Sequence, residues 1–167
     1  MSKKKIVIGT VALVIVVAGW YAFRPELLFV DQRVDEGLPA VEAATASSAP
    51  KSSVVASGQF HGVAHETAGQ AAIHRLPDGR QVLRFTNFST SNGPDVNVYL
   101  VAAPDARDND TVTSAGFVSL GAIKGNIGDQ NYELPEGIDL NTYRAVTIWC
   151  RRFSVNFGTA PLAPMGS

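Results

Sequence analysis

The residue with the clearest potential for chemistry is a lone cysteine, Cys150, which Arg151 and Arg152 follow directly. Guanidinium groups beside a thiol favour the thiolate, the form that reacts in oxidation and disulfide exchange. A lone cysteine at a buried strand position is, however, more often a small hydrophobic core residue. Because the sequence contains a single cysteine, an intrachain disulfide is excluded. A resolving thiol would have to come from a partner or a small molecule.

Histidines provide a second group of candidate ligands. His61 and His65 are four residues apart, which places both on one face of a strand, and His74 lies in the next β-rich run. Imidazole is a common ligand of haem, copper and zinc. His61 together with Cys150 could hold a prosthetic group such as haem, although nothing in the sequence places them together. The alternative is a hydrogen-bonded or surface role. The acidic loop at residues 105–110 lacks the spacing of an EF-hand, so we predict no metal site.

Two loops with many polar residues are candidate ligand-binding segments. Residues 87–95 contain a turn signal and end in Asp95, and residues 124–132 place Asp129 and Gln130 beside glycines. Loops of this kind on a β scaffold often bind ligands. They also form Asx-type turns in which the side chains satisfy their own backbone. Both interpretations stay open for Asp95, Asp129 and Gln130.

Short β-rich runs separated by Gly, Pro, Asn and Asp predict the elements that must position these residues. The predicted strands are residues 59–64, 71–76, 81–86, 96–101, 117–120, 131–134, 145–150 and 153–157. Apolar and polar side chains alternate in residues 96–101 and 145–150, which indicates one buried face in each strand. No sustained helical period follows residue 57. We predict a single all-β domain, a β-sandwich or barrel.

The N-terminal segment has the composition of a membrane anchor. Residues 6–23 contain no charged side chain, and a helix of that length spans roughly 27 Å, close to the hydrocarbon thickness of a bilayer. Three lysines precede it, which predicts a cytoplasmic N-terminus and an extracytoplasmic β domain, periplasmic or at the cell surface. The alternative is a cleavable signal peptide. The apolar run is longer than a typical signal-peptide core, and residues 20–23 form a poor cleavage site.

The composition divides the whole chain into four parts. They are a basic stub and anchor at residues 1–24, a juxtamembrane segment and Ala/Ser-rich linker at 25–57, the β domain at 58–162 and a tail at 163–167. We expect a short juxtamembrane helix that begins at Pro25, followed by a linker that cannot order itself. All 15 acidic side chains but only 10 of the 14 basic ones lie beyond the anchor. This negative balance argues against binding to nucleic acid.

Several longer motifs occur in an order that resembles a known family. They are Gly58-Gln-Phe-His-Gly-Val-Ala-His65 with Gly69, Leu83-Arg-Phe-Thr-Asn-Phe-Ser-Thr-Ser-Asn-Gly-Pro-Asp95, Val98-Tyr-Leu100, Leu120-Gly-Ala-Ile-Lys-Gly-Asn-Ile-Gly-Asp-Gln-Asn-Tyr132, Ile148-Trp-Cys-Arg-Arg-Phe-Ser-Val-Asn-Phe157 and Ala160-Pro-Leu162. Over these motifs the chain resembles the DM-thirteen ("electron transfer DM") domain family. A single-pass anchor before one such domain is similar to the bacterial members.

The resemblance implies a β-rich extracytoplasmic domain with a role in electron transfer. In the family this role is centred on a cysteine that matches Cys150, either as a bare thiol or as the holder of a prosthetic group such as haem. His61, Asp95, Asp129 and Trp149 match further motif positions. We therefore expect a membrane-anchored electron-transfer module with an extracytoplasmic redox or protein partner, rather than an autonomous enzyme. The alternative is a non-catalytic binding module whose cysteine packs the core.

Overall fold

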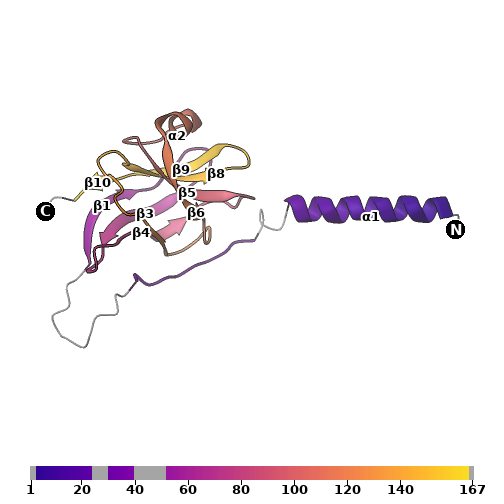
Figure 1. Ribbon diagram of the computed structural model, residues 1–167, viewed down its shortest axis with the longest axis horizontal. Helices are drawn as coiled ribbons and strands as arrows, with labels where there is room; N and C mark the ends of the chain where they lie inside the picture. The colour runs from indigo at the N-terminus through magenta and orange to yellow at the C-terminus, as the bar shows by residue number, and fades with distance from the viewer. Residues whose placement is uncertain (1–2, 24–29, 40–51, 166–167) are drawn as a thin grey trace.

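Ten strands in the described part of the chain form two antiparallel sheets that pack as a β-sandwich (Figure 1). This computed structural model describes residues 3–23, 30–39 and 52–165. The first sheet, in the order β10-β1-β3-β4-β7, contains β1 (Ser53–Gln59), β3 (Ala68–Arg75), β4 (Gln81–Ser89), β7 (Gln130–Glu133) and β10 (Ala163–Pro164). The second, in the order β2-β9-β8-β5-β6, contains β2 (His61–Gly62), β5 (Val96–Val101), β6 (Phe117–Ala122), β8 (Ala145–Cys150) and β9 (Val155–Pro161). The predicted all-β architecture is confirmed.

The two central strands of the second sheet, β5 and β8, match the predicted ranges 96–101 and 145–150. Their alternation predicted one buried face, but every residue of both strands is buried. The outer face is covered by helix α2 (Asn109–Ala115) and the loop before it. Asp108 caps this helix by accepting a hydrogen bond from the backbone amide of Thr111 at 2.7 Å. Seven residues are too few to show a helical period, so the sequence did not predict α2.

Strand β1 begins at Ser53, within the residues expected to form the linker. It pairs with β3 from Ser53 opposite Arg75 to Gln59 opposite Gln70. The strand predicted at residues 59–64 contains only the end of β1 and the two residues of β2. Alanine, serine and glycine are weak strand formers, and here pairing with a neighbouring strand overrides their local preference.

The main core lies between the sheets and is rich in aromatic rings. Phe85 has no exposed area, and its ring centroid lies 5.0, 4.9 and 5.4 Å from those of Phe60, Phe88 and Tyr132. Cys150 belongs to the same buried cluster. The lone thiol is therefore surrounded by hydrophobic side chains.

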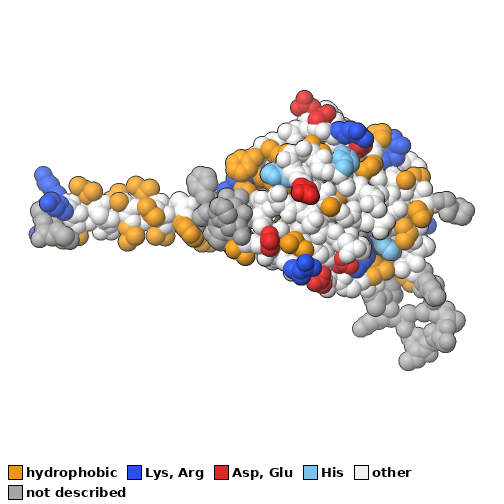
Figure 2. Space-filling view, turned by 180° about the vertical axis from the view of Figure 1, so that it is seen from behind, with side chains coloured by type: hydrophobic (Ala, Val, Ile, Leu, Met, Phe, Trp, Pro, Cys, Tyr) orange, Lys and Arg blue, Asp and Glu red, His pale blue; other side chains and the backbone are white. Residues whose placement is uncertain are grey.

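Helix α1 (Lys3–Phe23) is separate from this core. It is long and apolar enough to cross a membrane, and none of its apolar window, Lys3–Tyr21, is buried. Figure 2 shows hydrophobic side chains along its length and basic side chains at its N-terminal end. A helix with this surface could contact or span a bilayer.

A short extended segment, residues 30–39, lies along the loop that joins β6 to β7, and we call it the strap. The amide of Val34 donates to the carbonyl of Ile127, and the amide of Glu36 donates to that of Asp129, both at 2.9 Å. These bonds satisfy backbone groups of both segments, as the partners of a sheet would. The strap is thus attached to the sandwich in a defined register.

The prediction of a juxtamembrane helix that begins at Pro25 is wrong for the residues of the strap, which contain no helix. The other part of that prediction, residues 25–29, lies outside the described residues, as does most of the predicted linker at residues 40–51. Pairing with the β6–β7 loop replaces the local helical hydrogen bonds that were expected for the strap.

Candidate functional site

Cys150 is the last residue of β8, where it pairs with Val96 of β5 and Val155 of β9. Its side chain has no exposed area and carries a free thiol. Together with Val146 and Ile148 it faces the space between the sheets. A bulky reagent or a partner's disulfide can reach this thiol only if the end of the strand opens.

The arginine that follows Cys150 pairs with a carboxylate and not with the thiol. Arg151 Nε donates to Asp95 Oδ2 at 3.0 Å, and the Arg151 amide donates to the Asp95 carbonyl at 2.9 Å. Asn97 Nδ2 donates to the same carboxylate at 3.0 Å. Burial raises the pKa of Asp95, but the hydrogen bonds from Asn97 and Arg151 outweigh this and hold it below its usual range. Asp95 therefore fixes the turn after β8.

His61 lies on a different face of the second sheet from Cys150. It pairs with Thr159, which in turn pairs with Thr147, and opposed residues share a face. Thr147 and Cys150 are three positions apart, so their side chains point to opposite faces. His61 Nε2 instead contacts Asp105 Oδ1 at 2.9 Å.

These two residues do not fit a haem. Cys150 is enclosed by the core and His61 is bonded on the outer face, so they cannot ligate one iron together. Among the described residues, no group of three or more His, Cys, Asp and Glu side chains is placed to hold a metal ion. What Cys150 offers in this structure is a free thiol, not one half of a shared haem site with His61.

Trp149 packs in the second, outer cluster and is 5 % exposed. Its ring lies 6.4 Å from that of Tyr99, which stacks on Phe117 at 4.2 Å with an interplanar angle of 3°. The Trp149 ring therefore contributes packing area on this face rather than projecting into the polar loops.

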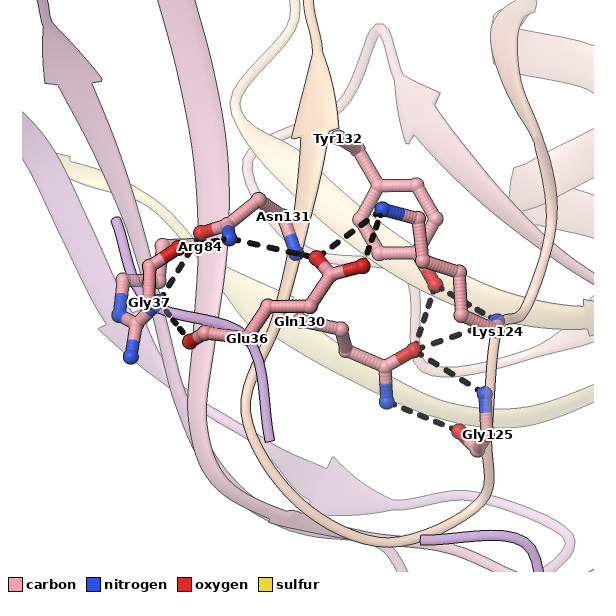
Figure 3. Close-up of polar contacts among 8 residues, drawn as sticks. All are labelled: Glu36, Gly37, Arg84, Lys124, Gly125, Gln130, Asn131 and Tyr132. Carbon is pink, nitrogen blue, oxygen red and sulfur yellow. Dashed lines mark hydrogen bonds and ion pairs between the residues drawn. The ribbon is translucent and has the colours of Figure 1, made fainter. Parts of the chain in front are cut away.

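Gln130 organises the β6–β7 loop from inside the protein (Figure 3). It has no exposed area. Its Oε1 accepts from the amides of Lys124 (3.2 Å) and Gly125 (3.3 Å) and from the Tyr132 hydroxyl (2.7 Å), and its Nε2 donates to the Gly125 carbonyl at 2.8 Å. Both ends of the Gln130 amide are thus bonded within the protein, to the loop and to Tyr132, so the buried side chain holds the loop's shape and is not exposed to a ligand.

Asp129 joins the same loop to β4. Its Oδ2 accepts from Arg84 Nη2 at 2.6 Å, and its Oδ1 accepts from the Asn87 amide at 2.9 Å. Arg84 also donates to the strap at the carbonyl of Glu36 (2.8 Å) and to Asn131 Oδ1 (3.0 Å). The guanidinium thus links two strands, the loop and the strap.

Glu36 is the strap's main side-chain contact (Figure 3). Its carboxylate oxygens lie 2.7 and 3.0 Å from Lys124 Nζ, and one of them accepts from the Asn131 amide at 2.8 Å. The carbonyl of the next residue, Gly37, accepts from Asn131 Nδ2 at 2.8 Å. Charge, side-chain amide and backbone contacts thus converge on two residues of the strap.

A comparison with family models matches residues 59–162 to the family described as Electron transfer DM13. The chain belongs to the DM13 family. The match begins at the end of β1 and ends just after β9, so it covers nearly all of the sandwich and excludes the strap and α1. No curated protein and no solved structure matches the chain.

The contact between the DM13 domain and the strap was not predicted from the sequence. Two glycines in the β6–β7 loop carry the signal that could have indicated it. A Cβ on Gly125 would overlap the carbonyl oxygen of Gln32, and one on Gly128 would overlap that of Val34. Glycines are required where another backbone approaches closely. Gly125 and Gly128 therefore indicate that another backbone segment lies close to the loop, but they do not identify that segment.

The strap should bind to the DM13 domain less tightly in acid. Burial raises the pKa of Glu36, but the hydrogen bonds from Lys124 and Asn131 outweigh this and hold it below 4.5. The pKa of the Glu36 carboxyl is lower when the strap is docked than when it is free. Ionisation of Glu36 therefore stabilises docking fully above about pH 4.5, and this stabilisation is lost as the pH falls through the pKa of the docked state. Hydrogen-exchange protection factors of the Val34 and Glu36 amides should fall over that range. Glu36→Gln should remove this pH dependence, and an unchanged acid response in the variant would contradict the assignment.

Proposed function

We propose that the protein is a membrane-anchored electron-transfer domain that works on the extracytoplasmic side. The observation that carries the proposal is the match of the sandwich to the family described as Electron transfer DM13. Helix α1, with its apolar surface and with basic side chains at its N-terminal end, supports the anchoring and the orientation. The soluble part would then be held close to donors and acceptors at the membrane surface.

In this proposal Cys150 is the redox group, and its chemistry uses a hydroperoxide and a partner thiol. The hydroperoxide transfers one oxygen to the thiol, which becomes a sulfenic acid, and leaves as an alcohol or water. The partner thiol then attacks the sulfur, giving a mixed disulfide and water. The free state of Cys150 supports this role. Its position at the end of β8, next to the exposed turn at residues 151–154, supports access through a limited opening.

A second function is favoured by the complete burial of the thiol. The domain would then be a non-catalytic interaction module in which Cys150 packs the core. An open hollow of about 530 Å³ between the strap and β7 would be its candidate ligand surface, with Lys124 and the Tyr132 ring in its wall. In the redox function the Cys150 thiol reacts in the folded protein, whereas in the interaction module it stays unreacted in the core.

Trapping of the thiol separates the two functions. In the full chain in lipid nanodiscs, Cys150 should react with a bulky maleimide about 100-fold more slowly than in urea, because reaction requires local opening. Hydrogen peroxide should nevertheless give a sulfenic acid that dimedone traps in the folded chain. Cys150→Ala supplies the control without a thiol. Dimedone trapping only in urea would reject the redox role and leave the interaction module.

A further inference from the structure

The strap determines which end of the sandwich lies nearest to α1. The helix ends at Phe23 and the strap begins at Val30, so at most about 25 Å of extended chain separates them. At its beginning, the strap is attached through Asp31, whose Oδ1 accepts from Asn92 Nδ2 at 3.0 Å and from Asn126 Nδ2 at 2.8 Å. The loop before β5 is therefore held near the end of α1.

The turn between β8 and β9, residues 151–154, belongs to this same end of the sandwich. Asp95, in the loop before β5, holds Arg151 through both its carbonyl and its carboxylate. Val96, the first residue of β5, pairs with Cys150, the last residue of β8, so the turn lies at the end of the sandwich where β5 begins. A chain of contacts thus runs from the strap through the loop to this turn.

The exposed side chains of the turn combine an aromatic ring with positive charge. Phe153 is 61 % exposed, more than any other large hydrophobic side chain in the described residues 52–165. The Arg151 side chain is 68 % exposed, and Arg152 is exposed beside it. Phenylalanine is one of the side chains that interfacial segments bury at the boundary between headgroups and acyl chains, and guanidinium groups bind phosphate in a bidentate manner.

We propose that this Arg-Arg-Phe turn, residues 151–153, contacts the surface of the bilayer that α1 crosses. Phe153 enters the headgroup region, and the two arginines contact lipid phosphates. The inference rests on the anchoring part of the proposed function. A short connection to an anchored helix gives an effective concentration near the millimolar range, so even a weak contact is occupied. The contact would fix the orientation of the sandwich on the membrane.

Spin labels on the full chain test this contact. Phe153→Cys is labelled with a nitroxide in nanodiscs of phosphatidylcholine and phosphatidylglycerol mixed about 3:1. Glu136→Cys, an exposed site beyond the far end of β7, is the matched control. The label at residue 153 should collide about fivefold less often with a water-soluble nickel reagent than the label at residue 136, because the interface excludes it. The unmutated chain provides the blank for any labelling of Cys150.

A label at Ile15→Cys in α1 reports insertion of the helix independently. If that label lies in lipid while residue 153 is as accessible to nickel as residue 136, the turn does not contact the bilayer and the inference is overturned. If the label in α1 is also in water, the anchoring itself fails, and the inference falls with it. Arg152→Gln should make the label at residue 153 more accessible to the nickel reagent. If the accessibility does not rise, Arg152 is not part of the contact.

Discussion

Gly128→Ala is expected to release the strap from the DM13 domain. Gly128 has a φ of +102°, and a Cβ there would overlap the Val34 carbonyl oxygen and lie 2.9 Å from Asp35 Oδ1. The loop cannot move away freely, because Gln130 holds it from inside. Hydrogen exchange of the full chain in nanodiscs should show the Val34 amide losing nearly all of its protection.

Gly121→Ala is a closely matched control for this variant. Gly121 has a φ of +103°, but no atom of a non-adjacent described residue lies within 4 Å of the position that a Cβ would take there. Both variants carry the same conformational cost of about 1–2 kcal/mol for a left-handed alanine, so only Gly128→Ala should undock the strap. If Gly121→Ala undocks it equally, backbone strain and not the overlap with Val34 is responsible.

Gln130→Leu is expected to lower the free energy of unfolding of the domain by at least about 3 kcal/mol. The change removes the partner of the Gly125 amide, the Gly125 carbonyl and the Tyr132 hydroxyl hydrogen. Each buried polar group left without a partner costs about 1–3 kcal/mol. Urea unfolding of the full chain in nanodiscs, followed by the fluorescence of buried Trp149, measures the loss.

Tyr132→Phe gives the graded comparison. It removes one hydroxyl and keeps the ring that packs on Phe85 at 5.4 Å, so it should cost only about 1 kcal/mol. The Gly125 amide and carbonyl keep their bonds to Gln130 in this variant. Equal losses for Gln130→Leu and Tyr132→Phe would show that the hydroxyl alone matters and that the loop does not depend on Gln130.

The sequence predicted the central strands well, because their signal is local. β5 and β8 are rich in β-branched, aromatic and aliphatic residues, and such runs favour strands wherever they lie. Their second buried face was not predictable, since it depends on α2 and a loop that pack over it from elsewhere in the chain. β1 was missed for the opposite reason: its small residues have no strong preference, and its partner β3 decides its conformation.

The candidate site was predictable in its residues but not in their roles. Asp95, Asp129 and Gln130 were recognised as unusual polar residues of loops, and all three are bonded within the protein. Whether a polar loop side chain faces a ligand or its own backbone depends on distances that no local pattern encodes. Glu36 was not recognised at all, because its partner Lys124 is 88 positions away in the chain.

The position of the strap between α1 and β1 also determines how a mechanical force would travel through the protein. A pull on the sandwich away from an anchored α1 reaches the strap's hydrogen bonds to the β6–β7 loop before it reaches β1. Breaking those bonds would lengthen the connection between α1 and the sandwich by residues 30–52, whose fully extended span is at most roughly 80 Å. The sandwich could then follow a displaced partner over part of that distance while its sheets stay intact.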